Sequence, residues 1–385
     1  MYRDNRLDRL NKPYRIYAEY VEHDALEQFV RAMEQDEIAQ GALMPDTHTG
    51  YSLPIGAVVA AEQTVYPAFV GYDIGCGMSA LPIPVSPEAL RACAKAIFDS
   101  LYKAIPVGFA VNTRPSEDAT ALDPADLTEP ARFVAEGNGK ASRHWSYALG
   151  SLGGGNHFIE LGVDEADQVW AVIHSGSRGV GHGIAAHYMK LASGGQKARE
   201  GCFGLRTDSD AGQGYINDMN WALQFALDNR LEMMRRIVRT VNEITGEGGD
   251  ADFDRLINRN HNHATTSGDG YWIHRKGATH AEDGMLGVIP GNMRDGSFVV
   301  RGKGNPESLF SSSHGAGRVL GRRQAKETLE MGEFVKAMDG IVARVEEKTL
   351  DESPFCYKDV FEVMRLQRDL VDVLHHIKPV INIKG

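Results

Sequence analysis

The chain has 385 residues, of which 42% are hydrophobic and 24% are charged, and this composition is typical of a globular protein with a substantial core in one large domain or two. The formal net charge of -11 argues against a protein that coats itself with nucleic acid by bulk attraction, although it allows a local basic channel. The sequence contains no signal peptide, no apolar run long enough to span a membrane and only four cysteines without paired spacing, so we expect a soluble, reduced, cytoplasmic protein.

The amino-terminal part of the chain predicts one core helix and two strands. The first twenty residues mix charged and aromatic side chains without a clear period and carry no prediction. Asp24 and Glu27 form a capping-box pattern at the start of a helix with one apolar face. A polar loop over residues 46–50 follows, and Pro54 precedes a β-branched run that predicts a strand. The segment VGYDIGCGM at residues 70–78 is expected to be a glycine-rich turn, after which MSALPIPV returns as a strand.

The middle of the chain alternates helices and strands. The pair Ser86-Pro87 matches the first positions of a helix, which we expect to run until shortly before Pro106. Residues from about 110 to 140 are polar and contain prolines, which predicts a surface excursion. GGGNHFIEL and VWAVIH each predict a strand beside a glycine-rich loop. A long helix is expected from about Gly214 to Thr245, with Gly246 as its stop.

The carboxy-terminal part predicts strands followed by two helices. YWIHRKGAT and SFVVRGKG read as strands on either side of the turn VIPGNMRDG. Helices are expected at about 324–347 and 358–377, with Pro379 closing the second before a short terminal strand, VINIKG. No internal repeat and no obvious linker interrupts the sequence. We therefore expect a single α+β domain over residues 1–385, with βα units too irregular for a doubly wound sheet.

A carboxylate and a thiol stand three residues apart in the glycine-rich turn, at Asp73 and Cys76. This pattern alone is weak, because a reduced cysteine often behaves as a small buried hydrophobe. His157, His174 and His261 follow, each in a loop or at an element end. Together the five residues form a mixed ligand set for more than one divalent ion, and a bridging sulfur could serve two.

The ligand set lacks the paired cysteine spacing of structural zinc sites, so it favours open coordination positions and catalysis. Any single histidine could instead be a core residue with satisfied hydrogen bonds.

His314 lies in SSSHGAGR, where backbone amides, hydroxyls and Arg318 could surround phosphate oxygens. One interpretation is that His314 is a nucleophile toward phosphorus. The alternatives are a further metal ligand or a buried histidine in a glycine-rich turn, and spacing alone leaves all three open. Asp46 likewise could cap its own turn or take part in catalysis.

Basic residues gather in the second half of the chain. Most could form a solvated face, but those between 275 and 323 lie in or beside the candidate site loops, where a polyanion would need them. The set comprises Arg178, Arg235, Arg236, Arg239, Arg259, Arg275, Lys276, Arg301, Lys303, Arg318, Arg322 and Arg323.

At this point a set of motifs resembles a known family over nearly the whole chain. The matching stretches are MPDTHTGY, GYDIGCGM, GGGNHFIE, HSGSRG, the His261-Asn262 pair, HRKGAT, IPG, SHGAGR and the terminal lysine-glycine. In their order and number they are similar to the RtcB RNA-splicing ligases.

The resemblance implies an RtcB-like α+β fold with a metal site on loops at strand ends. Cys76 would bridge two Mn²⁺ ions, one also bound by Asp73 and His157, the other by His174 and His261. His314 would be guanylylated by GTP. The enzyme would then pass GMP to an RNA 3′-phosphate, and a 5′-hydroxyl would displace it, in tRNA splicing or RNA repair. A 2′,3′-cyclic phosphate would first be opened to the 3′-phosphate.

The resemblance also implies a nucleotide site. Asn156 would hold the GTP phosphates, while Glu160 and Lys384 would read the guanine edge, because guanine offers N–H donors to a carboxylate and O6 to an ammonium. Weaker expectations follow for Asp46 beside the guanylylation centre and for Arg178 on phosphate or RNA. The remaining expected contacts are Gly315, Ala316, Gly317 and Tyr357 on the nucleotide, and Arg318 on phosphate.

Two departures from the family pattern lie beside the nucleotide site: Gly321 stands where serine is usual, and NMRDGS at 292–297 replaces an SMGT-like run. They keep two other hypotheses open, namely a binuclear metallophosphoesterase that opens cyclic phosphates without ligation, and a catalytically silent RNA-binding paralogue. An archease-type activator is a further expected partner. Imidazole and thiolate would also accept Zn²⁺, which binds such ligands more tightly than Mn²⁺.

Overall fold

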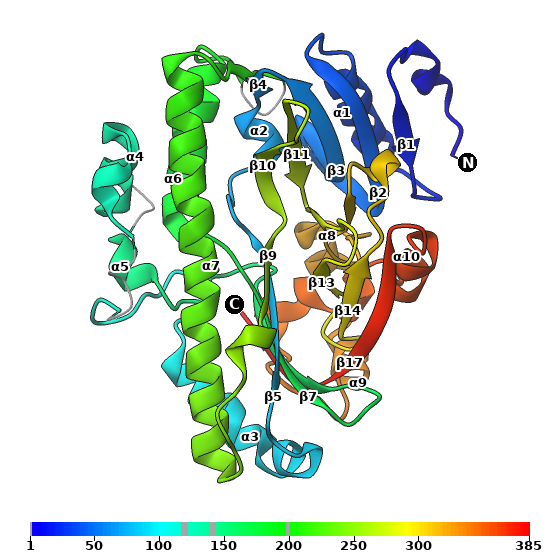
Figure 1. Ribbon diagram of the computed structural model, residues 1–385. Coiled ribbons are helices and arrows are strands. Elements are labelled where there is room, and N and C mark those ends of the chain that lie inside the picture. Colours follow the sequence, from blue (N-terminus) through cyan, green and yellow to red (C-terminus); the bar gives the residue numbers. More distant parts are fainter. Residues whose placement is uncertain (1, 117–121, 139–142, 198–200) are drawn as a thin grey trace.

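The computed structural model describes residues 2–116, 122–138, 143–197 and 201–385, which form two large β-sheets with helices around them (Figure 1). The five-stranded sheet runs in the order β1 (Tyr14–Ile16), β2 (Ile38–Tyr51), β3 (Leu53–Glu62), β11 (Tyr271–Lys276) and β10 (Asn262–Thr266). The larger sheet runs β13 (Leu286–Pro290), β14 (Ser297–Gly302), β17 (Val371–Lys384), β6 (Phe158–Val163), β7 (Val169–Ser175), β5 (Gly77–Ile83) and β9 (Ile257–Asn260), with β16 (Val342–Ala343) beside β17.

Two short pairs complete the described strands, β12 (Ala278–His280) with β15 (Ser311–Ser313) and β4 (Thr64–Val65) with β8 (Leu205–Arg206). Only β1–β2 and β16–β17 pair parallel among the described strands. The described α-helices are α1 (His23–Met33), α2 (Pro67–Val70), α3 (Pro87–Ala104), α4 (Glu129–Ala135), α5 (Trp145–Ala148), α6 (Arg178–Ala192), α7 (Asp210–Thr245), α8 (Arg322–Thr328), α9 (Met331–Ala337) and α10 (Val360–Leu366). The predicted α+β class with mixed sheets is confirmed.

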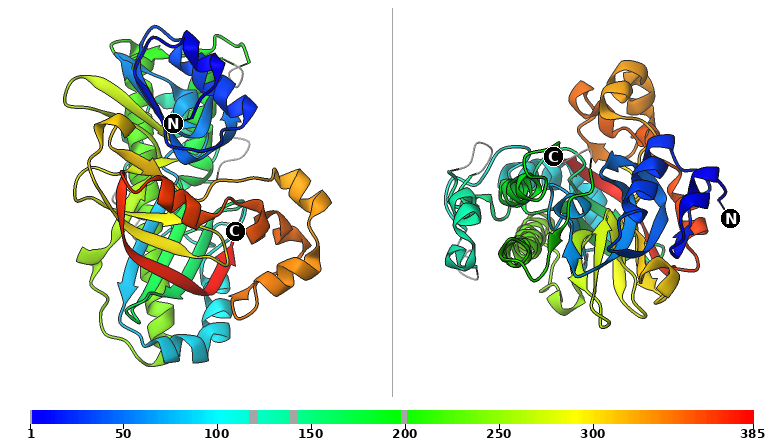
Figure 2. Two further views of the ribbon diagram at one scale, coloured as in Figure 1. Left: turned by 90° about the vertical axis from the view of Figure 1, so that its right-hand side faces the viewer. Right: turned by 90° about the horizontal axis from the view of Figure 1, so that it is seen from above.

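The larger sheet is covered on both faces, which explains its continuous apolar strands. On one face, α3 and α7 pack against β5, β6 and β7 through a core that includes Leu81, Ile173 and Ile237. On the other face the sheet curves back on itself, so that Phe158 and Val172 meet apolar side chains of its own strands β13, β14 and β17. Helices α6 and α7 run side by side at one flank, and the segment around α8 and α9 projects from the body (Figure 2).

Several predicted elements are confirmed. Ser86 caps α3 by accepting a hydrogen bond from the Ala89 backbone N–H, and α7 ends at Gly246, whose φ of +66° is left-handed. Helix α7 begins at Asp210, four residues before the predicted start. The strand after Pro54, MSALPIPV, FIEL, VWAVIH, YWIHRK and SFVVRG all form strands.

Other predictions are wrong. Helix α1 has Glu22 at its N-cap and no side-chain capping bond, so the predicted capping box is absent there. Residues 46–50 belong to the irregular strand β2, not to a loop. Helix α6 starts inside the expected loop after His174. In the predicted excursion at 110–140, α4 forms in the described part, while residues 117–121 and 139–140 lie outside the described residues.

The predicted carboxy-terminal helices differ most. The expected helix at 324–347 is broken into α8 and α9, because Leu329 takes an extended conformation between them. The helix expected at 358–377 ends at Leu366, and the chain then forms the fourteen-residue strand β17. Pro379 fits within this strand because the pairing with β6 shifts register between Pro379 and Ile381.

Candidate metal and nucleotide centre

The candidate metal ligands meet because of strand register. In the larger sheet, Met78 of β5 lies opposite His174 of β7, and Phe158 of β6 lies opposite the same His174. Cys76 and His157, which precede β5 and β6, therefore lie at the same edge as His174. His261 follows β9, and its backbone N–H donates to the Cys76 carbonyl at 2.7 Å.

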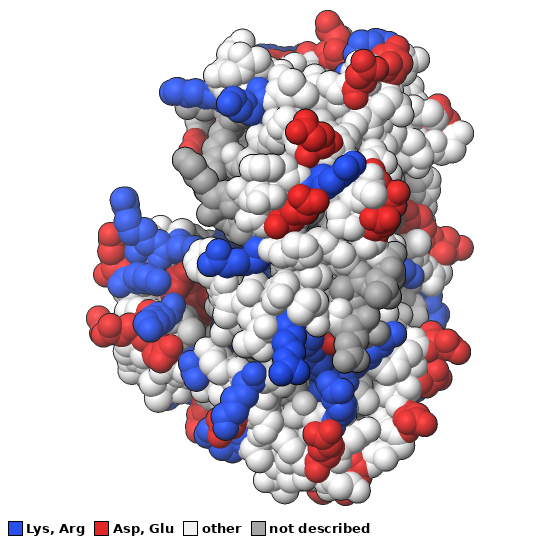
Figure 3. Space-filling view, turned by 90° about the vertical axis from the view of Figure 1, so that its left-hand side faces the viewer, with Lys and Arg blue, Asp and Glu red and all other residues white. Residues whose placement is uncertain are grey.

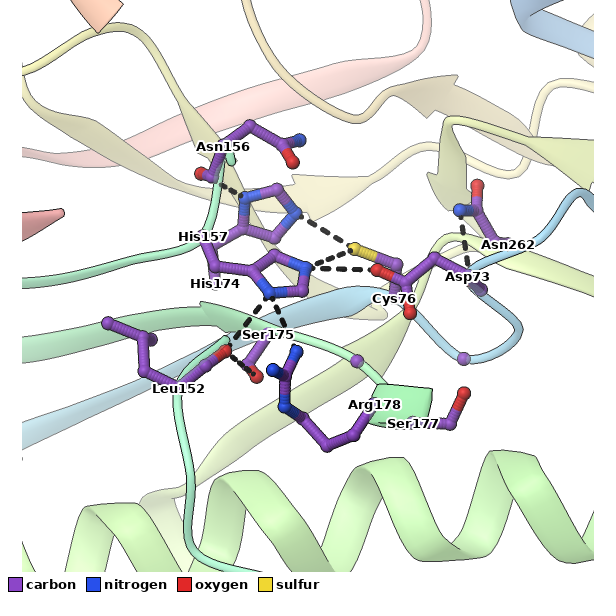
Figure 4. Close-up of polar contacts among 12 residues, drawn as sticks. Asp73, Cys76, Leu152, Asn156, His157, His174, Ser175, Ser177, Arg178 and Asn262 are labelled. Carbon is purple, nitrogen blue, oxygen red and sulfur yellow. Dashed lines mark hydrogen bonds and ion pairs between the residues drawn. The ribbon is translucent and has the colours of Figure 1, made fainter. Parts of the chain in front are cut away.

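The side chains converge on the Cys76 sulfur. His157 Nε2 lies 3.4 Å from Sγ, and His174 Nε2 lies 3.2 Å from it. Figure 4 shows both imidazoles directed at the sulfur. Asp73 Oδ2 lies 3.0 Å from His157 Nε2, and His261 Nε2 lies 3.3 Å from His174 Nε2. All five predicted ligands thus lie together, and the ligand atoms of Cys76, His157 and His174 are within 4.8 Å of one another.

Backbone carbonyls orient the imidazoles. His157 Nδ1–H donates to the Leu152 carbonyl at 3.0 Å, and His174 Nδ1–H donates to the Asn156 carbonyl at 3.1 Å. Because Nδ1 carries the proton in each ring, the lone pair is on Nε2, which faces the sulfur. Burial lowers the pKa of His174 and of His261 well below the ordinary value, so both rings are neutral.

The donor set fits divalent metal ions. Imidazole nitrogens and a thiol sulfur converge in a buried cluster, and the partly exposed Asp73 carboxylate lies at its edge. This donor set suits borderline metals better than Mg²⁺ or Ca²⁺. Burial, followed by the Asp73 charge, raises the pKa of the Cys76 thiol well above its usual value. A bound cation opposes both effects and stabilises the thiolate.

A buried arginine holds the chain segments next to Cys76 and His174 through hydrogen bonds to their backbone. Arg230 of α7 donates to the Gly75 carbonyl at 2.9 Å and to the Ser175 carbonyl at 2.8 Å. It also donates to Asn258 Oδ1 and Asn260 Oδ1, each at 2.7 Å. The role of Arg230 could not be predicted from the sequence, because a single arginine inside a long amphipathic helix gives no sign that it points inward.

His314 lies beside the candidate metal ligands, which we call the metal cluster, and forms a hydrogen bond with Asp46. Its ring centroid is 4.8 Å from that of His261. Its Nδ1 lies 2.7 Å from Asp46 Oδ2, and its backbone N–H donates to the same oxygen at 3.2 Å. Burial alone would raise the pKa of Asp46, but His314, His48 and Lys358 outweigh it and hold the pKa below the usual range. Asp46 is 0% exposed, so its charge acts on His314 without solvent screening.

Close packing around this pair requires glycine at one position. Gly317 has a φ of +77°, and a Cβ there would lie 2.2 Å from the Asp46 carbonyl oxygen. The second glycine of SHGAGR, Gly317, therefore lets the loop that carries His314 approach Asp46 closely.

His314 opens into a cavity of about 290 Å³. The predicted nucleotide residues all line it, namely Asn156, Glu160, Gly315, Ala316, Gly317, Tyr357 and Lys384. Phe158, Asn292, Met293 and Asn382 also contribute to its wall. Burial raises the pKa of Glu160 to about 8, although Ser297, Asn382 and Lys384 oppose the shift, and Asn382 Nδ2 donates to its Oε2 at 3.3 Å.

A second carboxylate organises one wall of this cavity. Glu352 accepts from Lys384 Nζ at 2.7 Å, from Arg322 Nη1 at 2.6 Å and from the Tyr357 hydroxyl at 2.6 Å. Burial alone would raise its pKa, but Lys384 and Arg322 lower it to about 2. The sequence analysis missed Glu352, because an acidic residue in DESPFCYK resembles any surface charge.

The two predicted phosphate-binding arginines have different surroundings. Arg178 lies beside the metal cluster, with Nη1 at 3.5 Å from His157 Nδ1 and Nη2 donating to the Gly108 carbonyl at 3.0 Å. Arg318 donates to the Leu320 and Asp351 carbonyls and to Glu352, so its guanidinium holds the cavity wall.

The two departures noted in the sequence occupy defined places. Gly321 is the N-cap of α8, and a Cβ there would meet open space. Residues 292–296 form a turn before β14, in which Asn292 Oδ1 accepts from the backbone N–H groups of Arg294 and Asp295. Asn292 and Met293 thereby reach the cavity beside His314.

Comparison with known proteins agrees with this geometry. The family model described as "tRNA-splicing ligase RtcB" matches residues 28–385. The chain belongs to the RtcB family. It is 34% identical to the RNA-splicing ligase RtcB of Escherichia coli (strain K12), over 97% of this chain and 98% of that protein. It is 28% identical to the tRNA-splicing ligase RtcB of Thermococcus kodakarensis, over 98% of this chain and 95% of that protein.

The chain is also 29% identical to the RNA-splicing ligase RtcB2 of Escherichia coli (strain ATCC 25922), over 95% of this chain and 93% of that protein. Within the part of this RtcB-family chain that the structure describes, every helix is too short or too polar to cross a membrane.

Proposed function

We propose that this protein is a GTP- and Mn²⁺-dependent RNA ligase that joins a 3′-phosphate or 2′,3′-cyclic phosphate end to a 5′-hydroxyl end through a His314–GMP intermediate. RNA ligase activity follows from membership in the RtcB family. The observation that carries the finer proposal is the position of His314, which is fixed by Asp46, adjoins the metal cluster and opens into the nucleotide cavity.

His314 has the geometry of a nucleophile. Because Nδ1–H donates to the Asp46 carboxylate, the lone pair lies on Nε2. Nε2 attacks the α-phosphorus of GTP, a nitrogen–phosphorus bond forms, and the bond from that phosphorus to the departing pyrophosphate breaks. Asp46 stabilises the positive charge that develops on the imidazole.

The metal ions have two proposed ligand sets that share Cys76. Asp73 and His157 would hold one Mn²⁺, and His174 and His261 would hold the other, with the Cys76 thiolate between them. When bound, the ions neutralise the negative charge that builds on the phosphate oxygens during transfer. The cluster would also accept Zn²⁺, so availability decides which metal is loaded.

The base of GTP is proposed to bind between Glu160 and Lys384. Glu160 accepts from the guanine N1–H and amino group in its ionised form, and Lys384 Nζ donates to O6. Glu352 holds that ammonium at 2.7 Å before the nucleotide arrives, so Lys384 is already oriented. Asn156 and the backbone of Gly315, Ala316 and Gly317 would contact the phosphates, and Tyr357 would pack on the nucleotide.

In the second and third steps the RNA ends meet at this centre. An oxygen of the RNA 3′-phosphate attacks the phosphorus on His314, which releases the imidazole and yields an activated 3′ end. The 5′-hydroxyl then attacks the RNA phosphorus and displaces GMP. Arg178, beside His157, is proposed to bind the RNA phosphate. We infer tRNA splicing as the setting, because the relatives are named RNA- and tRNA-splicing ligases, and RNA repair would use the same chemistry.

A ligation assay tests the proposal. Two RNA strands, one ending in a 2′,3′-cyclic phosphate and one beginning with a 5′-hydroxyl, are incubated with the protein, GTP and Mn²⁺. We expect a joined product that requires both GTP and His314, and an archease-type activator is expected to raise only its turnover. Opening of the cyclic phosphate without GTP and without joining would indicate a metallophosphoesterase. RNA binding by Cys76→Ala equal to that of wild type, with no bound metal in either, would indicate a silent paralogue.

A further inference from the structure

A groove leads away from the candidate metal ligands Asp73 and His157 and reaches α7. It consists of two adjoining cavities of about 570 and 810 Å³, which share Ala110 and Val111 in their walls. The first contains Asp73, His157 and Arg178 in its lining. The α7 groove, as we call both cavities together, therefore begins at the metal cluster itself.

The floor of the α7 groove is the segment 106–116, which is tied down at both ends. At the inner end, Arg178 Nη2 donates to the Gly108 carbonyl at 3.0 Å. At the outer end, Arg236 of α7 donates to Asn112 Oδ1 at 2.7 Å and to the Gly150 carbonyl at 3.1 Å. These two arginines fix the floor relative to both the metal cluster and α7.

The outer cavity is strongly basic in a chain with a net charge of -11. Its lining includes Lys103, Arg114, Arg235, Arg236 and Arg239, against one acidic residue. That residue, Glu232, is already paired with Arg236 at 2.8 Å. Five cations therefore line this wall beside one carboxylate, four of them exposed (Lys103, Arg114, Arg235 and Arg239), and Lys and Arg side chains gather on this flank of the molecule (Figure 3). Such a local excess attracts a polyanion that the whole molecule would repel.

The inner cavity offers flat aromatic surfaces. Phe109, on the floor segment, is 97% exposed. Tyr72 and His182 stack on each other with ring centroids 4.7 Å apart in the same cavity. An exposed phenyl ring beside phosphate-binding cations is the combination that binds single-stranded nucleic acid, since bases stack on the ring while the backbone follows the charge.

We propose that the α7 groove binds the single-stranded RNA next to the end that reacts at the metal cluster, with a base on Phe109 and the following phosphates on Lys103, Arg114, Arg235 and Arg239. The inference rests on the proposed ligase function and extends it, because it names where the body of the substrate lies. It also predicts that the protein holds RNA over several nucleotides beyond the junction and ignores their sequence, since neither stacking nor phosphate contacts read base identity.

The test compares two pairs of substitutions. Arg235→Gln with Arg239→Gln removes two exposed charges of the groove. Arg9→Gln with Arg368→Gln removes two exposed charges, one in the amino-terminal segment and one after α10, on the far side of the molecule (Figure 1), and serves as the matched control. Binding of a fluorescent 5′-hydroxyl RNA of about sixteen nucleotides is measured over a series of salt concentrations, beside one of about four nucleotides.

For the groove variant with the longer RNA, we expect the slope of log affinity against log salt to fall by about 1.4, since each phosphate contact contributes about 0.7 for single strands. When salt rises from about 50 to about 200 mM, the factor by which affinity falls is then about sevenfold smaller for the groove variant than for wild type. With the four-nucleotide RNA, the groove variant should have the same salt slope as wild type, and the control variant should match wild type with both RNAs. Phe109→Ala should weaken binding of the longer RNA without changing the slope. Equal slopes for the groove variant and the control would overturn the proposal.

Labelling of the same variants with GTP separates this inference from the proposed function. The groove variant should form the His314 adduct as fast as wild type, because its substitutions lie outside the nucleotide cavity. Normal labelling with an unchanged salt slope contradicts the groove alone. No labelling in wild type with a reduced slope in the groove variant contradicts the ligase mechanism and leaves the RNA surface supported.

Discussion

Substituting Asp46 by Asn tests the link between the buried carboxylate and the nucleophile. The change keeps the shape of the side chain but removes the charge that lies 2.7 Å from His314 Nδ1. A hydrogen bond to a charged group contributes about 1.5–3 kcal/mol, and each 1.36 kcal/mol corresponds to a tenfold change in rate. We therefore expect guanylylation of His314 to slow by roughly 10- to 150-fold in Asp46→Asn.

The assay is single-turnover labelling with radioactive GTP and Mn²⁺, together with the metal content of each protein. Asp164→Asn is the matched control, because Asp164 is also a buried carboxylate that pairs with a histidine, His375 at 3.0 Å, but lies outside the nucleotide cavity. The control should label at the wild-type rate. If Asp46→Asn, folded and with normal metal content, also labels at that rate, Asp46 does not set the tautomer and charge of His314.

Three further predictions concern the surroundings of His314. Cys76→Ala should reduce the bound metal from two equivalents to one or fewer, measured by elemental analysis after dialysis, and two retained equivalents would exclude a bridging thiolate. Because burial raises the pKa of Glu160 to about 8 and guanine needs the ionised form, GTP affinity should rise as pH increases through about 8; Glu160→Gln should remove this dependence in a titration, and an unchanged pH profile would refute the role. Arg230→Met removes a donor from four acceptors, one of which, Asn258 Oδ1, still accepts from Ser79 Oγ, and should lower the free energy of unfolding in urea by about 3–5 kcal/mol, whereas a loss below about 1 kcal/mol would show that water replaces the guanidinium.

The candidate metal ligands could be singled out in the sequence because each stands at the end of an apolar strand or in a glycine-rich loop. What the sequence alone does not contain is the register that brings them together. Met78 and Phe158 both lie opposite His174, and this pairing places Cys76 beside His157, although they are 81 residues apart in the chain. Residue types and positions suggested the group of five, and family resemblance supplied its division between two metal ions.

The same limit applies to contacts made over long separations. Asp46 and His314 are 268 residues apart, and an aspartate in a polar stretch fits a turn equally well. The positions of Glu352 and Arg230 depend on which way one helix or loop faces, and a single charged residue does not reveal this.

The strand β17 was mistaken for a helix for a definite reason. Leu370, Val371, Leu374 and Ile377 recur at spacings of one, three and three residues, which fit a helical face. In the structure, residues 371–384 pair with β14 on one side and β6 on the other. Tertiary pairing thus overrides a local pattern that was compatible with both structures.

The most direct test of the account is the intact mass of the protein after incubation with GTP and Mn²⁺, measured for wild type and for His314→Ala. We predict that wild type gains the mass of one GMP and that His314→Ala, folded and with its metal bound, gains none. An equal gain in both proteins, or no gain in a folded and metal-loaded wild type, would contradict the proposal that His314 is the nucleophile of this ligase.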